Sequence, residues 1–378
     1  MEKVVKTSLS PDTAKTAAKS AKSLTPKDKA KTTETATVKA NPIIKTSPNG
    51  PILARRLLTN YPLLILLSLF VMLISLGLTG KESSYGYAKL LEFLKNPQDT
   101  TLYTMYMTIK APRIVLAFLV GALLASSGVV VQSVFLNPLA DPYIIGIASA
   151  ATFGAVLAYL IGLSDFYYGI FAFAASIALS LFILSLYRRG QSITTLLILG
   201  IAIAAFLGAF TSFAIYLIGQ DSFKITAWMM GYLGSASWYK ISLVIAPLIV
   251  CIAFFYYKRY ELDILLCGDE EALSLGLNAQ RLKKQLLITA SLAVAYSVAF
   301  TGMIGFVGLI IPHILRLFLR TSSNALLIPA SCFFGGIFLL CCDDLARSII
   351  YPVEIPIGII TAFFGAPFFM FLALRFRG

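Results

Sequence analysis

Charged residues are scarce in this sequence of 378 residues. They account for 13% of the chain, while 58% of the residues are hydrophobic; soluble domains carry about 25% charged residues. Such a chain cannot cover the surface of a soluble protein of its size. Several apolar runs reach the roughly 20 residues with which a helix crosses a bilayer. The composition predicts an all-α polytopic membrane protein and argues against a transmembrane barrel, whose segments are short and alternating.

Residue types that commonly carry chemistry are also few. The chain has a single histidine, His313, and its five cysteines show no CxxC spacing, so we expect them to be small apolar packing residues. No GxxxxGK[ST] phosphate-binding sequence is present. No clustered histidine, cysteine and carboxylate residues favour an integral membrane enzyme. We therefore expect no catalytic residue, no metal site and no cofactor, and any ATP hydrolysis must reside on another polypeptide.

Positive charge is concentrated near the N-terminus. Residues 1–60 hold twelve of the 31 Lys and Arg residues, against four Asp or Glu, so they supply much of the net charge of +13. Residues 1–54 contain no aromatic residue and little apolar material, and cannot bury enough surface to offset the entropy of ordering. We predict a disordered, basic cytoplasmic tail over 1–54 and a transmembrane domain over 55–378. The charge is not a nucleic-acid signal, and no nucleic-acid partner is expected.

Ten apolar stretches are predicted to span the membrane. They cover residues 57–78, 112–135, 142–161, 166–187, 195–218, 238–257, 286–300, 306–319, 325–342 and 355–374. With ten spans, the basic clusters at 188/189, 258/259, 281–284, 316/320 and 375/377 all fall on one side, which is the cytoplasmic side by the positive-inside rule. Both termini and the polar loop 258–284 are then cytoplasmic. Residues 81–110 are external, with a short amphipathic helix near 87–94.

The loop 258–284 is the longest polar interruption after about residue 110. An acidic triplet over 269–271 stands at a predicted helix start, where carboxylates are favoured by the helix dipole. Gly276 should end this helix, and a second short helix can begin over 279–284. A membrane protein that keeps one conspicuous polar loop commonly uses it to touch a soluble partner. We therefore predict a docking element here.

Three further motifs interrupt the apolar pattern. Two prolines four apart, Pro138 and Pro142, predict a tight cytoplasmic hairpin between the second and third spans. The glycines of GMIGFVG, three residues apart, predict close helix contact and a sharp external bend. The stretch from Asp343 to Gly358 reads as a polar external turn. Each motif is also compatible with an ordinary turn or interfacial loop.

Six stretches, spread in order over residues 110–378, resemble the permease subunits of binding-protein-dependent ABC importers for iron–siderophore, haem and vitamin B12. They are APRIVLAFLVGALLASSGVVVQ, NPLADPYIIGIASAATFGA, WMMGYLGSASW, GDEEALSLGLN, GMIGFVGLIIPHILRL and DLARSIIYPVEIPIGIITAFFGAPFF. The first hundred residues match poorly. The resemblance implies a vitamin B12 importer permease-like fold of about ten transmembrane helices per subunit. It also implies a homodimer in the cell (inner or cytoplasmic) membrane, with the path at its two-fold axis, two ATPase subunits, and a periplasmic or lipid-anchored substrate-binding protein.

The resemblance also implies roles for individual residues. ATPase coupling falls to Gly268, Asp269, Glu270, Glu271, Leu275 and Gly276. Docking of the binding protein falls to Lys110, Arg113 and Arg347, where Lys110 departs from the family's arginine and gives up bidentate pairing with carboxylate. The gate and pathway would include Asn137, Leu139, Ser192, Thr194, Thr211 and Ser212. Without the resemblance, the basic residues read as snorkelling at the membrane edge.

An ion-coupled secondary transporter is the main alternative. That class usually places ionisable residues near the bilayer midplane, whereas the Asp and Glu residues here lie mostly at span ends or in loops. Uptake that survives ATP depletion but collapses with the ion gradient would favour it. The sequence leaves open which chelate is carried.

Overall fold

The computed structural model describes residues 60–78, 83–186 and 193–375, and these residues form helices and connecting segments without a strand. The chain divides into two units, Met1–Pro42 and Ile43–Gly378, and every described residue belongs to the second. The predicted tail over 1–54, the arginines at 188/189 and the gate residue Ser192 lie outside the described residues.

Ten apolar helices correspond one by one to the ten predicted spans. Six are long and apolar enough to cross a membrane: α7 (Ala111–Val134), α9 (Asp165–Leu186), α10 (Ile193–Ile218), α12 (Trp238–Tyr257), α15 (Ala279–Thr301) and α17 (Asn324–Ser348). Four apolar helices are shorter: α4 (Tyr61–Gly77), α8 (Ile147–Leu160), α16 (Val307–Leu319) and α18 (Ile357–Arg375). The all-helical membrane fold expected from composition is confirmed.

Shorter helices connect or flank these ten. They are α5 (Ser83–Lys95), α6 (Thr100–Tyr103), a π-helical turn (Thr104–Lys110), a 3-10 turn (Gly219–Ser222), α11 (Phe223–Met229), α13 (Arg259–Leu265) and α14 (Asp269–Ser274). The π-helical turn joins α6 to α7 in one apolar helical segment, Thr100–Val134. The amphipathic helix predicted near 87–94 is present as α5.

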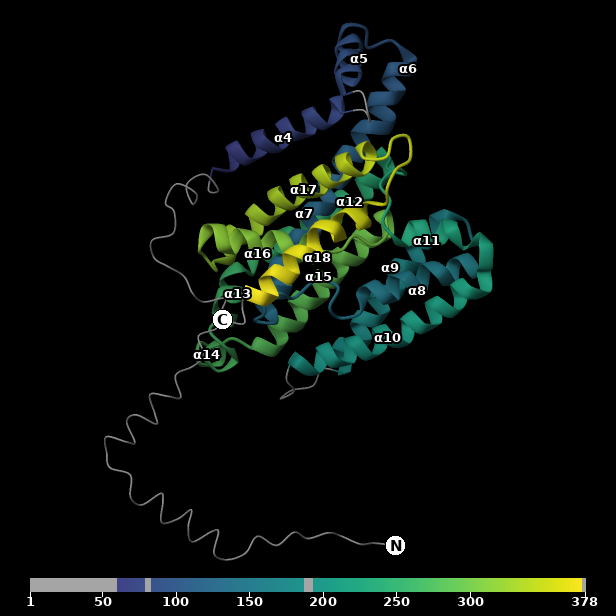
Figure 1. Ribbon diagram of the computed structural model, residues 1–378. Helices are drawn as coiled ribbons and strands as arrows, with labels where there is room; N and C mark the ends of the chain where they lie inside the picture. Colours follow the sequence, from purple (N-terminus) through teal and green to yellow (C-terminus); the bar gives the residue numbers. More distant parts are fainter. Residues whose placement is uncertain (1–59, 79–82, 187–192, 376–378) are drawn as a thin grey trace, which may run out of the picture. The chain divides into compact units, whose positions relative to one another are not determined.

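Helix α7 forms the core of the described unit, because nearly all of its residues are buried. Its most extensive contact is with α17, which runs alongside it in Figure 1. Glycines allow the backbones to touch: a methyl group on Gly121 would lie 2.3 Å from the carbonyl oxygen of Gly335, and one on Gly128 would lie 1.8 Å from that of Gly308. The close helix contact predicted from GMIGFVG is thus realised at Gly308, and Gly335 provides a second such contact with α7.

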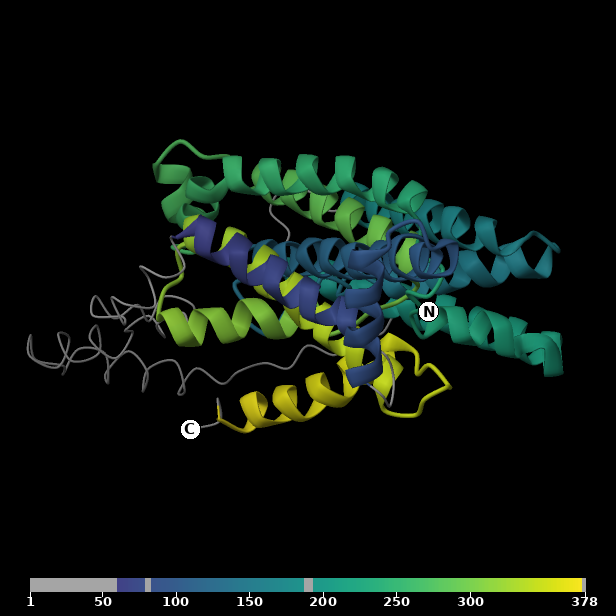
Figure 2. The ribbon, with the colours of Figure 1, turned by 90° about the horizontal axis from the view of Figure 1, so that it is seen from above.

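The polar segments gather at two opposite ends of the helices. Figures 1 and 2 show α13 and α14 at one end and α5 and α6 at the other. The turn between α16 and α17 lies at the α13 end, since Asn324 is hydrogen-bonded to Asp263. The cations Lys110 and Arg347 line a small cavity together at the other end. This separation agrees with the predicted sidedness of these two groups.

Three predicted boundaries are wrong. Helix α8 begins at Ile147 rather than at 142, because side-chain hydrogen bonds hold the preceding segment in turns. Helix α15 begins at Ala279 rather than at 286, because Asn278 caps it there by accepting a hydrogen bond from the Arg281 N–H at 3.0 Å. Helix α17 continues to Ser348, so the polar turn predicted over 343–347 is helical. Its charged side chains are paired, as described below, so the helix can continue through them.

Candidate functional site

The polar loop between α12 and α15 folds into the short helices α13 and α14. Gly268 precedes α14 at a φ of +123°, and Gly276 follows it at +79°, conformations that favour glycine. The predicted short helix that starts at the acidic triplet and stops before Gly276 is present as α14 (Asp269–Ser274). The predicted second helix over 279–284 is not a separate element, since these residues are the first turns of α15. The short companion of α14 is α13, which comes before it in the chain.

The three acidic residues of α14 are not equivalent. Asp269 accepts a hydrogen bond from the Lys283 ammonium, with 2.5 Å between Oδ1 and Nζ, and the Lys283 side chain is buried. This pair fixes α14 to the start of α15. Glu270 and Glu271 are exposed. Of the basic run 281–284, which was predicted to lie on the cytoplasmic side, Lys283 thus has an internal structural role.

Two leucines beside these carboxylates are exposed at the same turn. The exposed fractions of Leu273 and Leu275 are 69% and 67%. Both lie between the α12 and α15 spans, in a segment that is not itself apolar enough to enter the bilayer. The α14 turn therefore presents a small surface that is partly apolar and partly acidic. Exposed apolar groups rimmed by polar ones are typical of contact sites for other proteins.

A chain of polar contacts fixes this loop to the helices below it. Asp263 of α13 accepts hydrogen bonds from the backbone N–H and the side-chain amide of Asn324, both at 2.8 Å. The Asn324 side-chain oxygen accepts one from the Ser133 hydroxyl of α7 at 3.0 Å. Burial raises the pKa of Asp263, and these hydrogen bonds oppose that shift. The arrangement caps α17 and ties it to α13, which sequence reasoning missed because the partners are 61 residues apart.

The three predicted docking cations come together at the opposite end, around a cavity of about 170 Å³. Lys110 donates to the carbonyl oxygens of Leu76 and Leu78 at 3.0 and 3.2 Å, which places its charge at the C-terminal end of α4, where cations are favoured. Its ammonium also lies 5.0 Å from the centre of the Tyr106 ring. Lys110 is thereby buried and held in place.

The two arginines are paired with carboxylates of the same chain. Arg113 makes paired contacts with Asp343, at 2.9 to 3.1 Å, and with both oxygens of Glu354 at 2.9 Å. Arg347 contacts Asp343 at 3.2 Å between Nε and Oδ2, and it also contacts Asp344. The two arginines are thus paired with three carboxylates. Glu354 is the most exposed of the three acids, at 38% of its side chain, against 8% for Arg113.

The proline-rich segment after α7 is not a tight surface hairpin. Residues 135–146 form successive turns, in which Asn137 accepts a hydrogen bond from the Leu139 N–H at 2.9 Å and Asp141 one from the Tyr143 N–H at 2.8 Å. Such bonds compete with helix formation.

The position of this segment is set by its contact with Gly308. A methyl group on Gly308 would lie 2.5 Å from the ring of Pro142. The same methyl group would lie 2.8 Å from the carbonyl oxygen of Leu124. Since Leu124 is midway along α7, the segment re-enters the protein to that depth.

This re-entrant segment borders an apolar cavity of about 890 Å³. Leu139 and Asp141 line it together with side chains from the 229–230 and 303–306 segments and from α18. The predicted gate residue Leu139 is thus at a cavity wall. Its neighbour Asn137 instead shapes the turn.

The other predicted pathway residues are not gathered at this cavity. Thr211 is buried and donates to the Leu207 carbonyl of its own helix at 2.9 Å. Ser212 and Thr194 are exposed on α10. None of these three described residues lines the 890 Å³ cavity.

Comparison with known proteins gives consistent matches over most of the chain. Residues 65–375 match the FecCD transport family. The chain is similar to a hemin transport system permease protein of Yersinia pestis, at 34% identity over 84% of this chain and 97% of the relative. It is also similar to a cobalamin import system permease protein of Halobacterium salinarum, at 38% identity over 80% of this chain and 81% of the relative.

A solved structure also matches. It is described as an inward-facing conformation of a metal-chelate type ABC transporter, and it matches with a TM-score of 0.74 and 31% identity. The match covers 85% of this chain and 99% of the solved one.

Proposed function

This chain belongs to the FecCD transport family and is a permease of the metal-chelate type of ABC importer, and we propose that its α14 turn is the contact through which separate ATPase subunits drive transport. The chain performs no bond chemistry in this proposal. ATP binding and hydrolysis on the partners would move α14 and, through it, the helices to which it is fixed. The cargo would be a metal chelate of the iron-chelate, haem or cobalamin class, as for the named relatives.

The observation that supports this role most directly is the combination of exposure and anchoring at α14. Leu273 and Leu275 are exposed outside the spans, so lipid does not cover them. Burying a leucine side chain stabilises a contact by about 1.5–3 kcal/mol, which two exposed leucines can supply to a partner. The Asp269–Lys283 pair and the Asp263–Asn324 bonds fix the turn to α15 and α17. A force applied at α14 is therefore transmitted rather than absorbed by a loose loop.

The opposite end is proposed to receive the substrate-binding protein. The cluster of Lys110, Arg113 and Arg347 would pair with carboxylates on the lobes of that protein, as the family resemblance implies. Because all three cations already have partners in this chain, an incoming carboxylate must compete. Glu354 is the acid that would yield, since it is the most exposed and exposed ion pairs contribute little stability.

The assembly would follow the family pattern. Two copies of this chain would place the path at their two-fold axis in the cytoplasmic membrane, with both termini and α13–α14 inside. The 890 Å³ cavity beside Leu139 would form part of the path, with Asn137 shaping the gate and Ser192, Thr194, Thr211 and Ser212 contributing from the fifth span and its approach. Ion-coupled transport is not proposed, because the relatives and the matched structure support an ATP-driven importer.

Co-purification tests the α14 contact. The double change Glu270→Arg with Glu271→Arg reverses the charges of the two α14 acids other than Asp269, which is paired with Lys283, and should abolish association with the ATPase subunit and uptake of the chelate. Glu92→Arg, an exposed charge reversal on α5 at the other end, is the matched control and should leave ATPase association unchanged. Normal association and transport in the double variant would overturn the proposal.

A further inference from the structure

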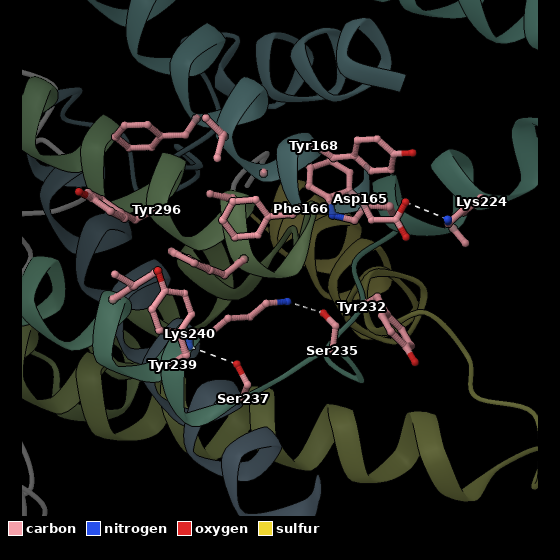
Figure 3. A pocket seen from close by; sticks show the side chains of 18 of the residues that line it. Asp165, Phe166, Tyr168, Lys224, Tyr232, Ser235, Ser237, Tyr239, Lys240 and Tyr296 are labelled. Carbon is pink, nitrogen blue, oxygen red and sulfur yellow. Dashed lines mark hydrogen bonds and ion pairs between the residues drawn. The ribbon is translucent and has the colours of Figure 1, made fainter. Parts of the chain in front are cut away.

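Figure 3 shows a second large cavity, of about 850 Å³. It is lined by the ends of α9, α12 and α15 that point away from α13 and α14. Helix α12 starts here at Trp238 and runs towards α13, while α15 starts beside α14 and ends here at Thr301. Nine of the nineteen lining residues are aromatic. Aromatic side chains concentrate where membrane spans meet the lipid headgroups, so the cavity opens at a membrane interface.

Among the residues that the structure describes, one cation of this cavity lacks a neutralising carboxylate. Lys240 of α12 donates from Nζ to the Ser235 hydroxyl at 2.7 Å. The acidic side chain among the lining residues is Asp165, and it pairs with Lys224 at 2.8 Å. Figure 3 shows the two pairs on different sides of the cavity. The Lys240 charge is therefore satisfied by a neutral hydroxyl, in a site whose other walls are mostly apolar.

The walls become apolar with depth. Phe173 lies eight residues beyond Asp165 in α9, and Leu243 lies one turn beyond Lys240 in α12; both line the cavity. At a rise of about 1.5 Å per residue, Phe173 is roughly 12 Å further into the membrane than the start of α9. The mouth of the site thus carries a cation and hydroxyl groups, and its interior is apolar. A lipid molecule has the same order, with a polar headgroup at the interface and apolar chains deeper in the membrane.

We propose that this cavity binds an anionic phospholipid. The phosphate would accept hydrogen bonds from Lys240 and Ser235, and an acyl chain would lie along Phe173 and Leu243. A small soluble anion would leave the apolar interior uncovered, and a zwitterionic lipid would bring a second positive group to Lys240. A basic residue near anionic lipid contributes about 1 kcal/mol. We therefore expect a preference of roughly fivefold for an anionic over a zwitterionic headgroup, because tenfold corresponds to about 1.4 kcal/mol.

The two tryptophans of the chain provide a matched pair of reporters. Trp228 lines the cavity, whereas Trp238 is half exposed at the start of α12 and is not among the lining residues. In the full chain carrying Trp238→Phe, the remaining Trp228 reports from the cavity. In the full chain carrying Trp228→Phe, the remaining Trp238 reports from the surrounding lipid. Both are reconstituted in phosphatidylcholine vesicles with a small fraction of brominated phosphatidylglycerol or brominated phosphatidylcholine, and fluorescence quenching is measured.

Brominated phosphatidylglycerol should quench the Trp228 reporter at roughly one fifth of the concentration that brominated phosphatidylcholine needs. The Trp238 reporter should show little difference between the two lipids. Lys240→Gln should remove the difference at Trp228, while Lys240→Arg should keep it. Lys258→Gln, which removes a paired lysine at the far end of α12, is the charge-matched control and should also keep it.

Equal quenching of Trp228 by both lipids would overturn the proposal, and so would a preference that persists in Lys240→Gln. Absence of quenching at Trp228, with normal quenching at Trp238, would overturn it as well, because it would show that lipid does not enter the cavity. An unchanged Trp238 signal in Lys240→Gln verifies that the variant is folded and inserted. These readouts do not require ATPase association, so they are independent of the transport proposal.

Discussion

Arg113 of α7 and Asp343 of α17 form a buried ion pair in which Nε and Nη2 of the guanidinium each reach the carboxylate, at 3.0 and 2.9 Å. The pair joins the two most extensively packed helices near the end where the small cavity opens. Removing one partner of a buried pair is costly, because the other charge stays buried without compensation.

Asp343→Asn should therefore lower the free energy of unfolding by about 3 kcal/mol, since it leaves both Arg113 and Arg347 without the full carboxylate. Glu354→Gln is the matched control and should cost less than about 1 kcal/mol, because Glu354 is the most exposed of the three acids. Unfolding in mixed detergent micelles measures both. Equal losses in the two variants would contradict the ranking of the two acids.

Glu354→Gln should at the same time strengthen docking of the substrate-binding protein. The change removes the internal competitor for Arg113 while keeping the shape of the side chain. An affinity increase of about fivefold corresponds to the roughly 1 kcal/mol of an exposed ion pair, measured by titration of the binding protein onto the reconstituted transporter. A weaker complex would show that Glu354 itself contacts the binding protein.

Gly128→Ala should disrupt the packing of α7 against α16. The added methyl group would meet the Gly308 carbonyl oxygen at 1.8 Å, a backbone atom that cannot rotate away. We expect a loss of about 3 kcal/mol or more, the upper range for overpacked cores. Gly208→Ala in α10 is the matched control, because a methyl group there meets nothing within 4 Å in the part of the chain that the structure describes. Thermal denaturation in detergent should separate the two variants, and similar melting temperatures would refute the close contact.

Asp263→Asn should change how stability depends on pH. Burial raises the pKa of Asp263 above the unfolded-state value of about 3.9, so the folded protein binds this proton more tightly than the unfolded chain. The contribution of Asp263 is thus full below about pH 4 and is lost as the pH rises through the folded-state pKa. Asparagine does not titrate. The melting temperature of the variant relative to the native chain should rise between about pH 4 and 7, whereas a constant difference would contradict the shift.

Ala362→Trp should slow uptake if the 890 Å³ cavity is part of the path. Ala362 lines that cavity, and a tryptophan there would fill part of it. A decrease of roughly tenfold corresponds to a barrier raised by about 1.4 kcal/mol. Ala227→Trp, in the 850 Å³ cavity, is the control and should transport normally. ATPase association should persist in both. Slower uptake only in the Ala227→Trp control would contradict the prediction and would indicate that the 850 Å³ cavity is part of the path instead.

The helices, and the separation of their polar segments to opposite ends, were predictable because they depend on local composition. Runs of apolar residues indicated ten helices, and the basic residues beside them placed α13 and α14 opposite the Lys110 cluster. The pairing of that cluster was not predictable in the same way. Arg113 and Asp343 are 230 residues apart in sequence, and no local pattern links them. The four-residue spacing of Asp343 and Arg347 was a usable signal, since residues four apart meet on a helix.

The re-entrant segment after α7 shows a different limit. Prolines at 138 and 142 indicated correctly that helix formation stops, and the Asn and Asp before them are typical turn residues. Its depth is set by Gly308, which lies between the Pro142 ring and the Leu124 carbonyl of α7. Depth is a property of packing between distant segments. A pattern of turn residues alone predicts a surface hairpin and a re-entrant loop equally well.

Helix α17 begins at Asn324, which is bonded to Asp263 beside the proposed ATPase-facing turn, and ends with Asp343 and Arg347 beside the proposed docking cations. A single packed element thus has one end at each proposed partner site. Binding energies coupled through it must be reciprocal. Whatever factor a nucleotide-bound ATPase applies to the affinity for the binding protein, the docked binding protein applies to the affinity for that ATPase state. A single coupling constant would then describe both affinity changes, so that measuring one of them predicts the other.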